Sequence, residues 1–217
     1  MSDFSPTWAP HRRTFTAMVL TLPLAGNAAA ARLAPTGVDV KSSAIHWPVD
    51  GTGDVHGFMA VPDRARGRQP AVLIVGDLDT SGDLLRATTI ATAQAGFVAC
   101  APTHVAGAIP GAALAIELRG SARWLATNRY ATGRIGAIGF GAGADLCAQL
   151  AAAGQVSAAI LFGARGPIPN GAALLSFEAD DRGNWREAAS SPGSDGFTGD
   201  WPGIWSQTTA FLREHLL

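Results

Sequence analysis

The chain has 217 residues, a formal net charge of −1, 47% apolar residues and 15% charged residues. This length and apolar content suit one compact globular domain with a sizeable core. The near-zero charge argues against a nucleic-acid partner, because phosphate binding needs clustered Lys and Arg, and Lys41 is the only lysine.

Residues 1–31 have the features of an export signal. Arg12 and Arg13 stand two places before Phe15, a short apolar core follows at 17–24, and 27–31 are small residues suited to cleavage. The paired arginines resemble a twin-arginine signal. The apolar core is shorter than the roughly 20 residues of a membrane-spanning helix, so no stable membrane span is expected. We therefore expect an exported, periplasmic protein whose folded domain comprises residues 32–217.

The rest of the chain alternates apolar strand-like runs with helical patterns, which predicts a mostly parallel sheet covered by helices on both faces. The pattern places strands at 38–46, 55–61, 70–75, 97–101, 134–139, 156–162 and 172–177, and helices at 84–95, 112–127, 144–153 and 205–216. In the second helix, Glu117 is grouped with the polar residues. Residues 183–200 are the least regular stretch and are expected to form a surface loop. Cys100 and Cys147 stand in apolar surroundings that favour buried free thiols over a disulfide.

The most informative segment runs from Arg134 to Ala144. A short apolar strand enters closely spaced glycines and a helix follows at once, which is the build of the G-x-S-x-G nucleophile elbow. Gly139 and Gly143 fill the two flanking glycine positions. The nucleophile position between them is Gly141, which has no side chain to attack with.

Four segments in this order resemble the dienelactone hydrolase family of α/β-hydrolases, over most of the chain from Val38 to Leu216. They are Gln69–Val75, Ala95–Pro102, Ile135–Gly143 and Trp205–His215. The resemblance implies a single α/β-hydrolase-type domain.

Members of that family cleave esters or lactones with a Ser or Cys nucleophile, a His base and an Asp that orients the His. By resemblance the base position is Asp195, before Gly196 and Phe197, and the acid position is Asp181, with Asp180 one residue short. An Asp is a weak proton acceptor at neutral pH, because its unperturbed pKa is about 3.9. The resemblance therefore implies a degenerate triad in which nucleophile and base are both lost.

The oxyanion hole is built from backbone N–H groups and survives side-chain substitution. By resemblance its donors are Ala142 and Leu78, and Asp77 borders the same pocket. A small ester, lactone or carboxylate is therefore the expected ligand, and a protein partner cannot be named.

His104 lies just beyond a strand end, where ligands bind in such sheets. Paired with the carboxylate of Asp77 or Asp79, it would form a general base with its orienting acid. The simpler interpretation is a histidine in a surface loop. His46 and His56 lie too far apart in sequence for a metal motif, and no HExxH or CxxC spacing occurs. We expect no metal and no cofactor.

Residues 139–144 also match G-x-G-x-x-A, the dinucleotide-binding fingerprint. The motif stands in the middle of the expected sheet, and the following strand ends without the acidic residue that grips a ribose. A nucleotide-binding oxidoreductase is therefore a remote alternative.

Two functional hypotheses follow. The leading one is a non-catalytic relative that keeps the fold and the backbone oxyanion pocket. The alternative is a weak or atypical ester or lactone hydrolase that uses water held in the pocket or another nucleophile, for which Ser81 is better placed than Ser176.

Overall fold

The computed structural model describes residues 38–217 apart from 64–66, 79, 81, 105–110, 168, 170–172, 180–184, 188–197 and 200. The predicted signal segment lies outside the described residues. In chain order the elements are β1 (Val40–Val49), β2 (Gly53–Pro62), β3 (Gln69–Val75), α1 (Gly82–Gln94), β4 (Val98–Pro102), α2 (Gly111–Thr127), β5 (Ala131–Phe140), α3 (Ala142–Ala152), β6 (Ala158–Phe162), β7 (Ala173–Ala179), β8 (Trp185–Glu187), β9 (Thr198–Gly199) and α4 (Trp201–Leu216).

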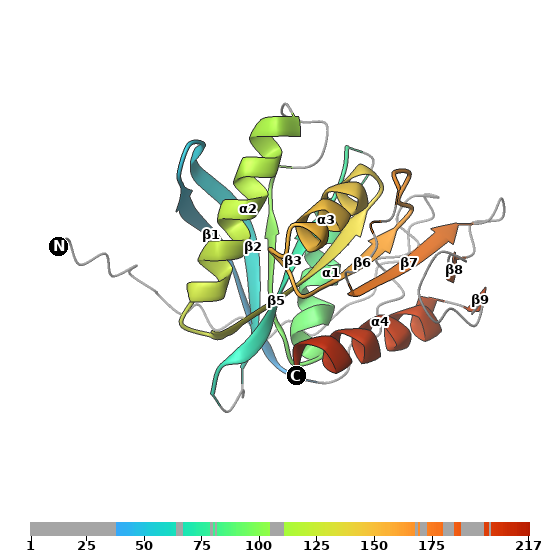
Figure 1. Ribbon diagram of the computed structural model, residues 1–217. Helices are drawn as coiled ribbons and strands as arrows, with labels where there is room; N and C mark the ends of the chain where they lie inside the picture. Colours follow the sequence, from blue (N-terminus) through green and yellow to red (C-terminus); the bar gives the residue numbers. More distant parts are fainter. Residues whose placement is uncertain are drawn as a thin grey trace.

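The strands form one sheet in the order β1-β2-β4-β3-β5-β6-β7-β8-β9. The five central strands, β4, β3, β5, β6 and β7, are parallel. The strands at both edges pair antiparallel. Helices cover both faces of this twisted sheet (Figure 1). The predicted fold class, a mostly parallel sheet with helices on both faces, is confirmed.

Side-chain alternation along the central strands explains the layers. In β3, Leu73 and Val75 pack into the core under α2 and α3, whereas Val72 and Ile74 pack into the core under α1 and α4. Because such a strand is buried on both faces, its sequence is a continuous apolar run. The parallel strands also end together, which collects the residues that follow β3, β4 and β5 at one edge of the sheet.

Helix α2 is fixed against the outer strand β1 by an aromatic contact and a buried hydrogen bond. The Trp47 ring stacks on Trp124 with a centroid separation of 4.8 Å, and its Nε1–H donates to Ser121 Oγ at 3.0 Å. A Cβ on Gly120 would collide with the side chain of Val49, so the helix reaches this depth only with glycine there.

Three expectations from the sequence need correction. Glu117 is buried, because it shares with Leu114 and Ser121 the stripe of α2 that faces the sheet. The stretch 183–200 contains the short strands β8 and β9, which pair antiparallel with the sheet edge. Helix α4 begins at Trp201, four residues before the expected start, because Pro202 is tolerated in a first turn.

Both cysteines, Cys100 and Cys147, are buried free thiols, as expected. Burial raises the pKa of each thiol far above its ordinary value. Within the part of the chain that the structure describes, no helix has the length and apolar character needed to cross a membrane.

Candidate functional site

The strand-to-helix turn after β5 has the geometry that its glycines predict. Gly141 stands between β5 and α3 with φ of 54° and ψ of −126°, a backbone conformation that L side chains rarely adopt. Its N–H donates to Phe162 O at 2.8 Å, and its carbonyl accepts from Ala144 N at 3.0 Å. The chain therefore keeps the sharp turn that presents a nucleophile in hydrolases of this build.

Helix α3 also lies against the end of β3 as an elbow requires. A Cβ on Gly143 would stand 2.6 Å from Val75 O and 2.8 Å from Gly76 O. Only glycine permits this approach of helix to strand. The glycine at 143 is therefore explained by packing alone.

The carboxylate of Asp77 occupies the volume that a side chain at position 141 would take. A Cβ built on Gly141 would stand 2.7 Å from Asp77 Cγ and overlap its Oδ2. A side chain at position 141 and the carboxylate of Asp77 therefore exclude each other in this arrangement.

Asp77 is held in that place by hydrogen bonds on both carboxylate oxygens. Ala142 N–H, at the first residue of α3, donates to Oδ2 at 3.0 Å. Thr80 Oγ1–H donates to Oδ1 at 2.8 Å, and Asp77 N–H donates to Thr80 Oγ1 at 3.1 Å. A carboxylate is favoured at a helix N-terminus, where unpaired N–H groups and the helix dipole both attract negative charge.

The predicted oxyanion donors are thus in different states. Ala142 N–H already donates to the carboxylate of Asp77, so a group of the protein itself occupies this donor. Leu78 follows Asp77 directly, and 68% of the residue's surface is exposed. A ligand carbonyl would reach the Ala142 donor only if the Asp77 side chain moved aside.

His104 has a carboxylate partner that the sequence did not indicate. Its Nδ1 lies 2.8 Å from Glu117 Oε2, with 45% of the His104 side chain exposed and only 2% of Glu117. The other oxygen, Glu117 Oε1, has no hydrogen-bond partner among the described residues. An ionised carboxylate only accepts, so Nδ1–H of His104 would donate to it, and in a neutral imidazole Nε2 would then be the acceptor, which is the arrangement of an oriented base.

Solved structures with the same fold include esterases and a dienelactone hydrolase candidate. A proposed dienelactone hydrolase from Klebsiella pneumoniae subsp. pneumoniae is 19% identical, with a TM-score of 0.54 over 82% of this chain and 80% of that one. The chain has the α/β-hydrolase fold. The resemblance to dienelactone hydrolases found in the sequence is therefore confirmed at the level of fold.

Two esterases share a smaller part of this α/β-hydrolase fold. A hyperthermophilic esterase from Pyrobaculum calidifontis is 19% identical, with a TM-score of 0.52 over 64% of this chain and 50% of that one. A thermostable carboxylesterase cloned from a metagenomic library is 17% identical, with a TM-score of 0.51 over 64% of this chain and 52% of that one. The chain spans about half the length of these esterases. No protein-family model and no curated protein matches the chain.

The remaining predicted positions of the α/β-hydrolase site divide into two groups. Asp181 and Asp195, together with Asp180, lie outside the described residues, as does Ser81. Ser176 is described and lies in β7 with 2% of its surface exposed. A serine so deeply buried in a central strand is poorly placed to attack a ligand.

The dinucleotide alternative conflicts with the charge at the same turn. A pyrophosphate would bind at the N-terminus of α3, but the Asp77 carboxylate already holds Ala142 N–H there. Two anions at one helix N-terminus repel each other. The charge of Asp77 at this turn therefore counts against a pyrophosphate bound there.

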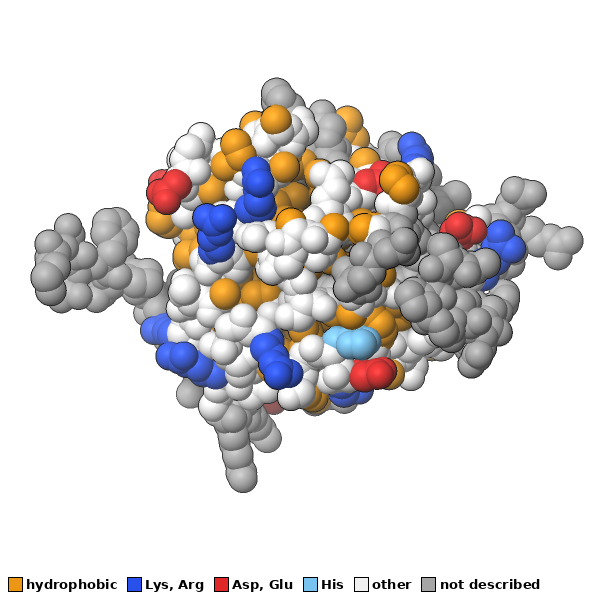
Figure 2. Space-filling view, in the orientation of Figure 1, with side chains coloured by type: hydrophobic (Ala, Val, Ile, Leu, Met, Phe, Trp, Pro, Cys, Tyr) orange, Lys and Arg blue, Asp and Glu red, His pale blue; other side chains and the backbone are white. Residues whose placement is uncertain are grey.

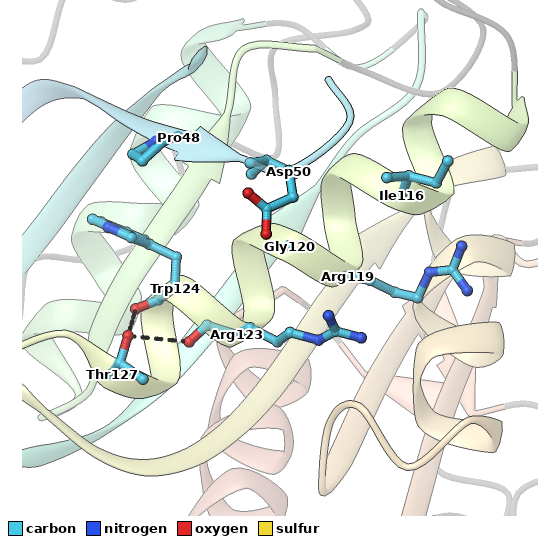
Figure 3. Close-up of a pocket in the computed structure, with 9 residues that line it drawn as sticks. Pro48, Asp50, Ile116, Arg119, Gly120, Arg123, Trp124 and Thr127 are labelled. Atoms are coloured by element: carbon cyan, nitrogen blue, oxygen red, sulfur yellow. Dashed lines mark hydrogen bonds between the residues drawn. The ribbon is translucent and has the colours of Figure 1, made fainter. Parts of the chain in front are cut away.

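A surface hollow of about 440 Å³ lies away from the elbow, between the C-terminal end of β1 and helix α2. In Figure 3, Arg119 and Arg123 extend from α2 in the same direction, and Asp50 lies near Gly120. No predicted site residue lines this hollow.

The expectation of no metal and no cofactor stays a prediction. No group of three or more His, Cys, Asp or Glu among the described residues could hold a metal ion. Figure 2 shows Lys and Arg side chains spread in ones and twos over the face that it presents. The absence of a nucleic-acid partner stays a prediction.

Proposed function

We propose that this chain is a hydrolase-fold binding protein that has lost covalent catalysis. The observation that carries the proposal is the Asp77 carboxylate in the volume that a nucleophile's side chain would take beside Gly141. Three changes then reinforce one another. No nucleophile stands at 141, no imidazole stands at 195, and the oxyanion donor of Ala142 is engaged.

The same carboxylate narrows the class of ligand. A ligand carboxylate would meet the negative charge of Asp77 at the helix N-terminus, and like charges at contact distance disfavour binding. A neutral ester or lactone meets no such repulsion. We therefore place small neutral esters and lactones ahead of carboxylates as ligands at the elbow.

The test is hydrolysis of p-nitrophenyl acetate by a series of restored variants. Wild type is expected to match the buffer rate. Gly141→Ser with Asp195→His is expected to remain inactive, because the new serine collides with Asp77. Adding Asp77→Ala removes the collision and frees Ala142 N–H, so only the triple variant should gain turnover and form an acyl-enzyme. Asp77→Ala alone is the matched control and should stay at the buffer rate.

A weak ester or lactone hydrolase is the second candidate, and the His104–Glu117 pair favours it. A histidine oriented by a buried carboxylate at the carboxyl edge of the sheet could activate a water for attack on a carbonyl. Wild-type turnover that falls at least about tenfold in His104→Gln would establish this candidate and sink the non-catalytic proposal. His215→Gln, on the distant helix α4, is the control.

We also propose that residues 1–31 direct export by the twin-arginine route. The supporting feature is the sequence alone, with Arg12 and Arg13 ahead of a short apolar core. Expression in a bacterial host should yield a periplasmic product that begins near Arg32. Arg12→Lys with Arg13→Lys should leave the uncut chain in the cytoplasm, whereas an uncut wild-type chain would contradict the proposal.

A further inference from the structure

Two exposed histidines face each other across the β1–β2 hairpin. His46 and His56 are directly opposed in the antiparallel register, and their ring centroids are 6.0 Å apart with a tilt of 42°. Their neighbours Trp47 and Val55 are buried in the core. Because side chains alternate along a strand, the two imidazoles stand on the opposite face of the hairpin, open to solvent.

The backbone that carries the pair is held on two sides. β1 and β2 pair over ten consecutive residues, with His46 and His56 inside the ladder. At the end of β4, Thr103 N–H and Thr103 Oγ1–H donate to His56 O at 2.8 Å and 2.9 Å. The two Cα positions are therefore fixed, and only the side-chain torsions remain to be set.

The geometry points to a two-histidine site for a divalent transition-metal ion. A metal–nitrogen bond of about 2.0–2.1 Å places each ring centroid about 3.2 Å from the ion, so two imidazoles on one ion have centroids roughly 4.5 to 6.4 Å apart. The observed separation of 6.0 Å falls within that range. We propose that His46 and His56 bind one such ion between them, with water in its remaining coordination positions.

The chemistry of the ligands fixes the class of metal. Neutral imidazole suits Cu²⁺, Ni²⁺ and Zn²⁺, whereas Mg²⁺ and Ca²⁺ prefer carboxylate and carbonyl oxygen. With two protein ligands, affinity should follow the general order in which Cu²⁺ binds most tightly. The site is independent of the elbow and of the function proposed for it.

Titration of the full chain with Cu²⁺, Ni²⁺ and Mg²⁺ tests the proposal. We expect Cu²⁺ and Ni²⁺ to broaden the imidazole proton NMR signals of His46 and His56 together, and Ni²⁺ to raise the thermal midpoint. Mg²⁺ should change neither. His46→Gln and His56→Gln should each weaken Ni²⁺ binding by about tenfold or more and abolish the thermal shift.

The matched control is His215→Gln, on α4, which should bind Ni²⁺ like wild type. Binding that survives in the double variant His46→Gln with His56→Gln would place the ion elsewhere and overturn the proposal. Unequal broadening, with only one of the two histidines affected, would also overturn it, because a single imidazole is not the proposed site.

Discussion

Gly141 has no Cβ, and the carboxylate of Asp77 lies in the volume that a Cβ would take. Each residue therefore determines what the other can be. Glycine at 141 also tolerates the φ of 54° that the turn imposes. Asp77 provides the acceptor for Ala142 N–H, the first N–H group of α3, and glycine has no side chain that could do so.

Replacing the glycine should therefore cost both strain and a collision. We expect Gly141→Ser to lower the free energy of unfolding by about 2–4 kcal/mol, measured by urea denaturation. Gly154 has a φ of 66° with open space around its Cβ position, so Gly154→Ser should cost only about 1 kcal/mol of backbone strain. Equal losses in the two variants would contradict the collision.

Removing the Asp77 carboxylate should leave the N-terminus of α3 without a hydrogen-bond acceptor. Asp77→Ala is expected to cost about 1–2 kcal/mol, because Ala142 N–H and the hydroxyl of Thr80 lose their acceptor. In the background of Gly141→Ser, however, the same change should be neutral or stabilising. The double-mutant cycle measures this coupling, expected at about 1–3 kcal/mol, and an additive result would contradict it.

At the scale of elements, the docking of α2 on β1 depends on the glycine in mid-helix. Helix propensity alone predicts that Gly120→Ala stabilises the protein by about 1 kcal/mol. Because the new methyl group collides with Val49, we expect a loss of about 1–3 kcal/mol instead. Val49→Ala should reverse the sign of the effect. Gly111→Ala, where the Cβ meets open space, is the control.

The elements themselves were largely predictable because their patterns are local. Continuous apolar runs marked the buried parallel strands, and closely spaced glycines marked the turn at Gly141. Glu117 was wrongly assigned to the polar face of its helix because its charge was given more weight than its position. It stands three residues after Leu114 and four before Ser121, on the same buried stripe. The short strands at 185–187 and 198–199 carry no apolar run, so only their pairing reveals them, β8 with β7 and β9 with β8.

Site chemistry was predictable only where residues are neighbours along the chain. Gly141 and Ala142 could be placed from the elbow motif, and Asp77 could be placed at the same edge of the sheet. Contacts across the fold could not be read in this way. The hydrogen bond from Ala142 to Asp77 joins residues 65 positions apart, and the His46–His56 contact depends on the register of a hairpin.

At the scale of the whole molecule, both thiols lie in the core and should react only when the fold opens. Burial holds the pKa of Cys100 and Cys147 far above the ordinary value of 9.0, so neither thiol ionises in the folded state at pH 8. Ellman's reagent should therefore detect no thiol in native protein and two after unfolding. If either thiol of the native protein reacted as fast as an exposed cysteine, its burial in the core would be contradicted.

The same burial gives a pH dependence of stability. A pKa that is higher in the folded state means that the unfolded chain releases protons first, so stability is intact below about pH 9 and falls as pH rises above it. Each thiol should contribute a slope of about 1.4 kcal/mol per pH unit in that range. Cys100→Ala with Cys147→Ala removes both contributions and should flatten the curve by about 2.8 kcal/mol per pH unit, measured by urea denaturation between pH 8 and pH 10.5.

At the elbow, the residues at positions 77 and 141 constrain each other's substitution, because a side chain at 141 and the Asp77 carboxylate need the same volume. A serine at position 141 would meet Asp77, and an alanine at position 77 would leave the N-terminus of α3 without its acceptor. Each single substitution is therefore penalised, and a serine at position 141 is accommodated only when position 77 changes with it. Positions 77 and 141 are therefore expected to vary together, whereas a position without such a contact can vary alone.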